Sequence, residues 1–335
     1  MVSMNVQAHL FPSNWEGSFE WLQPFHLLSM KEPPTDKEQM IEVSSDVILR
    51  FGLLEGDARV KGKRVIYDPQ SEEPKAFWDN GSSAEELALI LTPEELVRTV
   101  FPDSPDWSGD QIDRAIVELF QARRPGSLVV VLKDDDRLGG ASLYLGEEGR
   151  RLPTYAANGF FRIGAGDVFA SAFAYAWGER QLSPWDSADY AAKCVAYYLD
   201  GARLPLPPPE VIPTPKIGRE LPSEVRLVGR DTAEIGALLL YTEGWLREHF
   251  ACTPVLELFE SRPAPGKKIP TLLLADSLTS LDTIMNLSEQ AESDGPNVVY
   301  WPRYVSRSER EMSPRLRITD DYASALYQVL RGAIR

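Results

Sequence analysis

The sequence contains few of the residues that build metal centres and disulfide frameworks. Its 335 residues include two cysteines, Cys194 and Cys252, and three histidines. This cysteine pair forms neither a disulfide framework nor a metal-ligand spacing. We expect both to be apolar core residues of a cytoplasmic protein in a reducing compartment.

The chain also lacks long apolar runs and an excess of positive charge. No stretch approaches the roughly 20 apolar residues that span a bilayer, and residues 1–15 lack the pattern of a secretory signal. Thirty-five basic against fifty acidic residues give a net charge of −15, which argues against nucleic acid or an anionic membrane as the main partner. The negative net charge is compatible with a small phosphorylated ligand, because backbone amides can bind an anion on an acidic protein.

A proline-rich stretch divides the chain. Residues 204–222 contain Pro205, Pro207 to Pro209, Pro213, Pro215 and Pro222, which interrupt helices and sheet ladders and favour an extended spacer. The sequence therefore predicts one domain over residues 1–203, a linker over 204–222 and a second domain over 223–335.

Both predicted domains alternate strands with helices. In the first, apolar runs predict strands at 63–68, 87–91, 127–132 and 141–145, and helices after Thr92 and over 108–123. In the second, strands at 225–229, 270–276 and 297–301 alternate with helices over 232–250, 283–293 and 320–334. This order indicates the α/β class, with a layered first domain and a small doubly wound, Rossmann-like or flavodoxin-like second domain.

The sharpest local motif is Gly164-Ala165-Gly166-Asp167, directly before an apolar helical run. Glycines at a helix start expose N–H groups that can bind an anion. An acidic residue there can accept a proton from a hydroxyl that attacks a phosphate. The same residues are equally compatible with a plain turn and a first-turn helix residue.

The order of motifs resembles the ribokinase/PfkB family of sugar and nucleoside kinases from about Phe25 to Gly201. The matching stretches are Tyr67-Asp68-Pro69-Gln70, Thr92-Pro93-Glu94-Glu95, Val129-Val130-Val131-Leu132 with Gly139-Gly140, and Gly164 to Asp167.

This resemblance implies roles for individual residues. Asp167 would be the catalytic base, and the amides of Gly164, Ala165 and Gly166 would form the anion hole. Glu95 would lie near the Mg²⁺–phosphate site, and the segments at Lys133, Gly139 and Gly140 would line the nucleotide. The implied cofactors are ATP and Mg²⁺, and the implied substrate is a small sugar or nucleoside.

The first domain also departs from the family. Thr92 stands where the family has asparagine, and Phe161-Arg162-Ile163 replaces a polar triplet. We further expect residues 1–203 to lack the family's upstream substrate-binding part, which either the N-terminal segment or a partner subunit in a homo- or hetero-oligomer would have to supply. A catalytically degenerate nucleotide- or nucleoside-binding subunit is the alternative.

The second domain is similar to nucleoside 2-deoxyribosyltransferase-like proteins. Gly229 ends its first strand, Asp276 ends a later one, and residues 320–327 match the family's C-terminal helix. Asp282 and Glu289 are the carboxylates nearest to the expected nucleophile, and neither has the family's flanking glycines. Two interpretations of this domain stay open. It catalyses nucleoside deoxyribosyl transfer or hydrolysis, or it is a catalytically degenerate scaffold.

Overall fold

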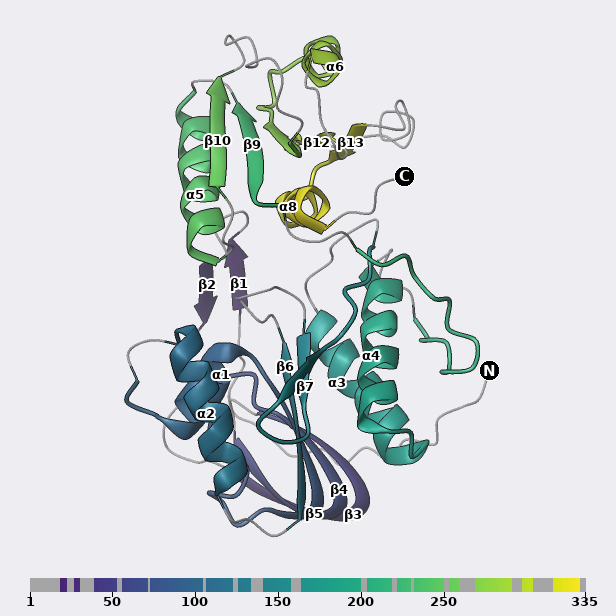
Figure 1. Cartoon of the computed structure of the whole chain (residues 1–335). Coiled ribbons are helices and arrows are strands. Elements are labelled where there is room, and N and C mark those ends of the chain that lie inside the picture. Colours follow the sequence, from purple (N-terminus) through teal and green to yellow (C-terminus); the bar gives the residue numbers. More distant parts are fainter. Residues whose placement is uncertain are drawn as a thin grey trace.

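The computed structural model places the chain in two groups of strands and helices (Figure 1). It describes residues 19–22, 27–30, 39–52, 56–71, 73–104, 107–122, 126–133, 141–157, 164–199, 204–218, 222–229, 232–249, 253–258, 269–290, 297–303 and 316–331. Within these residues no helix combines the length and apolar character needed to cross a membrane.

A six-stranded sheet forms the centre of the first group. Its order is β3-β4-β5-β6-β7-β8, parallel from β3 to β6 and antiparallel from β6 to β8. The strands are β3 Gln39–Phe51, β4 Gly56–Asp68, β5 Ser83–Leu91, β6 Ser127–Lys133, β7 Ala141–Tyr144 and β8 Gly149–Arg151. A separate antiparallel pair consists of β1 Phe19–Leu22 and β2 Leu27–Met30.

Helices cover both faces of this sheet (Figure 1). Alternate side chains of the strands point to opposite faces, so Ile66 and Ile90 pack in one apolar cluster while Val65 and Leu89 pack in the other. One face is covered by α1 Pro93–Val100 and α2 Gly109–Gln121, and the other by α3 Ala165–Phe173, η1 Ala174–Glu179 and α4 Pro184–Leu199. The predicted layered α/β class is confirmed.

The first three strands of this sheet bend. A straight strand of 13 residues would be about 40 Å long, whereas residues 52–55, which separate β3 from its parallel neighbour β4, can bridge at most about 19 Å. The pairing skips one position in each ladder, between Ser45 and Val47 on β3 and between Gly62 and Arg64 on β4. The strands curve there together, as Figure 1 shows at the lower end of the sheet, and Arg50 near the end of β3 donates to Asp57 near the start of β4 at 2.6 Å.

The second group is a five-stranded, all-parallel sheet. Its order is β10-β9-β11-β12-β13, which in chain order reads 2-1-3-4-5 and is the flavodoxin-like doubly wound arrangement. Helices α5 and α8 pack on one face, and α6 packs on the other. The elements are β9 Glu224–Gly229, α5 Ala233–His249, β10 Thr253–Leu258, β11 Thr271–Leu274, α6 Leu281–Gln290, β12 Asn297–Tyr300, β13 Leu316–Thr319 and α8 Tyr322–Arg331.

The proline-rich segment does not stand away from the first group as a spacer. Leu206 and Ile212 pack against the cluster formed with α3 and α4, and the Tyr190 hydroxyl donates to the Pro207 carbonyl at 2.8 Å. Further along, the Ala156 N–H donates to the Lys216 carbonyl at 2.8 Å. Proline removes an N–H donor but keeps its carbonyl and its apolar ring, so a proline-rich chain can still pack and accept hydrogen bonds.

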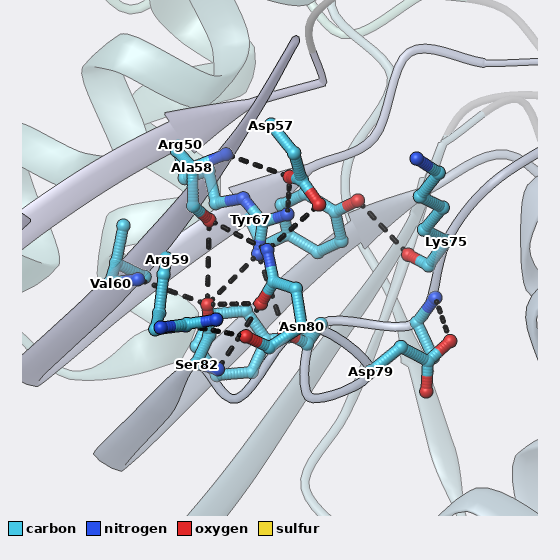
Figure 2. A network of polar contacts seen from close by, with 12 residues as sticks. Arg50, Asp57, Ala58, Arg59, Val60, Tyr67, Lys75, Asp79, Asn80 and Ser82 are labelled. Carbon is cyan, nitrogen blue, oxygen red and sulfur yellow. Dashed lines mark hydrogen bonds and ion pairs between the residues drawn. The ribbon is translucent and has the colours of Figure 1, made fainter. Parts of the chain in front are cut away.

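A buried polar network ties the loop after β4 to the edge of the sheet (Figure 2). Arg50 is 5% exposed and donates to the Asp57 carboxylate at 2.6 Å, to the Phe77 carbonyl and to the Ser82 hydroxyl. Its guanidinium also lies 4.5 Å from the centre of the Tyr67 ring. One arginine thus holds β3, β4 and the segment before β5 together.

Replacing Arg50 should destabilise this region strongly. Arg50→Met leaves the buried Asp57 carboxylate without its cation, and we expect the unfolding free energy to fall by about 3–5 kcal/mol. Lys63→Met is the control, because Lys63 pairs with Asp46 in an exposed ion pair on the same strands. The urea concentration at the unfolding midpoint of this variant should equal that of wild type. Urea denaturation measures both, and equal midpoints for the two variants would contradict a stabilising role for the network.

Candidate functional site

The carboxyl ends of β4, β5 and β6 bring two predicted residues, Lys133 and Glu95, and a third acid, Asp68, to one edge of the six-stranded sheet. Asp68 ends β4, Lys133 ends β6, and Glu95 lies in the first turn of α1, directly after β5. The start of α3 lies beside them, because a side-chain carbon added at Gly166 would be 3.9 Å from Lys133 Nζ. This edge is the candidate site.

A buried ion pair lies at the base of the site. Lys133 Nζ contacts the two carboxylate oxygens of Asp68 at 3.1 and 3.0 Å, and the Asp68 side chain is fully buried. Burial raises the Asp68 pKa to about 6, because desolvation disfavours the charged carboxylate; Lys133 opposes this shift, and the nearby Glu95 and Asp167 add to it. Lys133, predicted to line a nucleotide, here neutralises a buried acid.

The Glu95 side chain accepts hydrogen bonds from backbone N–H groups of the site. Its Oε2 accepts the Thr92 N–H at 2.8 Å, its Oε1 accepts the Ser71 N–H at 3.2 Å, and its own N–H donates to the Thr92 hydroxyl. This is a capping box that fixes the start of α1. Glu95 is 7% exposed, and its predicted place near a Mg²⁺–phosphate site stays a prediction.

The described residues form no multi-carboxylate metal centre and leave the predicted Mg²⁺ untested, because proteins often hold Mg²⁺ with one or two carboxylates and substrate phosphates. Within them, no group of three or more His, Cys, Asp or Glu side chains is arranged to hold a metal ion. Asp68 is paired with Lys133 and Glu95 with backbone N–H groups, as given above.

Asp167 is the exposed acid of the site. It lies in the first turn of α3, whose N-cap is Gly164 with a left-handed φ of 80° and no side-chain cap. Gly164 has no side chain that could accept a hydrogen bond from the first N–H groups of α3, and such helix N-termini attract anions. Asp167 Oδ1 accepts a hydrogen bond from Gln70 Nε2 at 2.5 Å.

Sequence analysis missed two residues of this site. Asp68 and Gln70 belong to a motif of the family resemblance, yet neither was assigned a role. An acid that closes an apolar strand of a parallel sheet is a signal for Asp68, since such strand ends meet at one edge. No local signal identifies Gln70. Gly139 and Gly140, predicted to line the nucleotide, and residues 161–163 lie outside the described residues.

The predicted residues of the second group have different surroundings, and a nucleophilic role for them stays a prediction. Asp276 follows β11 and is 5% exposed, and its Oδ1 accepts the Leu278 N–H at 3.1 Å and the Thr279 hydroxyl at 2.7 Å. Asp282 lies exposed in the first turn of α6, and Gly229 is buried at the end of β9 against α5. Asp276 therefore stabilises its own turn, and Asp282 faces solvent.

The Asp68 pKa has a measurable consequence for stability. Because the folded-state pKa is raised from 3.8 to about 6, the folded chain binds this proton more tightly than the unfolded chain. The stabilisation is complete below pH 3.8 and is lost as the pH rises through 6. We expect the unfolding free energy of wild type minus that of Asp68→Asn to fall by up to about 3 kcal/mol between pH 4 and pH 7.

Urea denaturation at several pH values measures this difference. The subtraction removes the contributions of the other carboxylates, which the two proteins share. A difference that stays constant, or that grows with pH, would show that Asp68 ionises as easily in the folded chain as in the unfolded one.

The comparisons with known proteins leave the family open. No protein-family model and no curated protein sequence matches the chain. Among solved structures, a probable sugar kinase protein from Rhizobium etli CFN 42 aligns over 41% of this chain and 48% of that chain, with 12% identity and a TM-score of 0.29. The chain thus spans about half the length of that kinase. The fold assignment rests on the strands and helices described above.

Proposed function

We propose that this chain is a protein of the sugar- or nucleoside-kinase type, in which the Asp167 carboxylate accepts a hydrogen bond from a hydroxyl group of a small-molecule ligand. The observation that carries the proposal is the placement of Asp167: an exposed carboxylate in the first turn of a helix whose N-cap is a glycine, directly after Gly166, which lies near Lys133 at the ends of the parallel strands. Ligands of open α/β sheets bind at this edge.

The arrangement suits a ligand that carries both hydroxyl and anionic groups. The Asp167 carboxylate can accept a hydrogen bond from a hydroxyl, and the first N–H groups of α3 can donate to a phosphate oxygen. With ATP as the phosphoryl donor, the ligand oxygen would bond to the γ-phosphorus as the bond to the leaving ADP oxygen breaks. Asp167 would take the hydroxyl proton.

A second candidate function is binding without phosphoryl transfer. Two residues that the family resemblance assigns to nucleotide and metal are engaged elsewhere, Lys133 with Asp68 and Glu95 with backbone N–H groups. These contacts favour a nucleotide- or nucleoside-binding regulatory or structural subunit. The two candidates share the hydroxyl site at Asp167 and differ in whether phosphate moves.

Calorimetry with ribose, fructose, adenosine and 2′-deoxyadenosine, each with and without ATP and Mg²⁺, tests the shared site. We expect wild type to bind at least one of these compounds and Asp167→Asn to bind it at least tenfold more weakly, because the amide lacks the anionic acceptor. Asp110→Asn is the matched control, since Asp110 is an exposed acid in the first turn of α2. Its affinity should equal that of wild type.

Phosphorus NMR on the same mixtures separates the two functions. Formation of ADP and a phosphorylated product that stops in Asp167→Asn identifies a kinase, and binding with no transfer identifies the binding protein. A wild type that binds none of these compounds would refute the proposed site.

A further inference from the structure

Gln70 links the end of β4 to the first turn of α3. Its Nε2 donates to Asp167 Oδ1 at 2.5 Å, across 97 positions of sequence. The bond joins an amide donor to a carboxylate acceptor, which is stronger than a hydrogen bond between neutral groups. Both side chains are exposed, so apolar packing does not hold them together.

The backbone of Gln70 has an unfavourable conformation. Its φ is 48°, in the left-handed region that residues other than glycine adopt rarely. Such conformations persist where neighbouring contacts determine them, and they concentrate at functional sites.

Contacts on both sides of Gln70 hold it in place. Before it, the Gly52 N–H donates to the Asp68 carbonyl at 2.9 Å, and a side-chain carbon at Gly52 would lie only 1.8 Å from the Pro69 carbonyl oxygen. After it, the Ser71 N–H donates to Glu95, which is itself fixed by the capping box. Hydrogen bonds to the residue after β3 and to the start of α1 thus fix the segment that carries Gln70.

We propose that Gln70 is the positioning residue of the site: its amide occupies one oxygen of Asp167 and orients the other toward the ligand hydroxyl. This inference rests on the proposed function of Asp167. Gln70 takes no part in bond formation and acts through the orientation of the carboxylate. Glu95 then contributes to the site through Ser71 and the Gln70 backbone.

Two substitutions separate positioning from a role in stability. Gln70→Gly removes the amide and also relieves the left-handed backbone, so the urea midpoint should equal or exceed that of wild type. Gln70→Glu keeps the shape and places a second carboxylate against Asp167. For both variants we expect calorimetry to show at least a tenfold loss of affinity for the compound that wild type binds. A purely structural residue would give the opposite result, a lower midpoint with unchanged affinity.

Gln121→Glu is the matched control. Gln121 also donates its side-chain amide to an exposed carboxylate, that of Glu147, at 3.0 Å, and it lies on α2. Its affinity should equal that of wild type. If Gln70→Glu fails to fold, Gln70→Gly still decides.

The outcomes separate the two proposals. If wild type binds a ligand and Gln70→Gly binds it equally well, the positioning role is wrong and the proposed function stands. If wild type binds no compound of the panel, the proposed function fails and the positioning role fails with it.

Discussion

The candidate site depends on one buried ion pair. The Asp68 carboxylate closes β4 inside the protein, where an unpaired charge is costly. Lys133 reaches it from the end of β6, across the intervening strand β5, and contacts both oxygens. The same ammonium group lies beside Gly166. The pair therefore ties the ends of β4 and β6 together next to the start of α3.

The acids at this edge have different tasks because their surroundings differ. Asp68 is buried against a cation and Glu95 is buried against backbone N–H groups, so both are used to hold the fold. Asp167 stands exposed at the end of a helix, where the helix dipole favours negative charge. Three carboxylates lie close enough to influence one another, yet only Asp167 is open to a ligand. Because of this difference in burial, we propose that Asp167 is the carboxylate that binds the ligand hydroxyl.

Sequence patterns located the regular elements and part of the site. Apolar runs predicted the strands that end at Asp68 and near Lys133, and Thr92-Pro93-Glu94-Glu95 carried the helix-start signature that the structure has. That signature predicted a helix start but no capping role for Glu95, and the metal-proximal role came only from the family resemblance. The bent pairing of β3 with β4 has no local signal, since a parallel neighbour normally requires a long crossover. The bond between Gln70 and Asp167 depends on where two distant segments meet, which only the folded chain shows.

The second sheet meets the first through the layer that carries Asp167. The Tyr327 hydroxyl on α8 donates to the Tyr155 carbonyl at 2.7 Å. The Tyr155 hydroxyl in turn donates to Asp189 on α4 at 2.5 Å, and α4 packs against α3. Tyr198 of α4 lies next to Gly164, where a side-chain carbon would be 3.1 Å from its hydroxyl oxygen. The second group thus contacts the first at Tyr155, while Asp276 is engaged in its own turn and Asp282 faces solvent, so the proposed chemistry assigns no role to these two carboxylates.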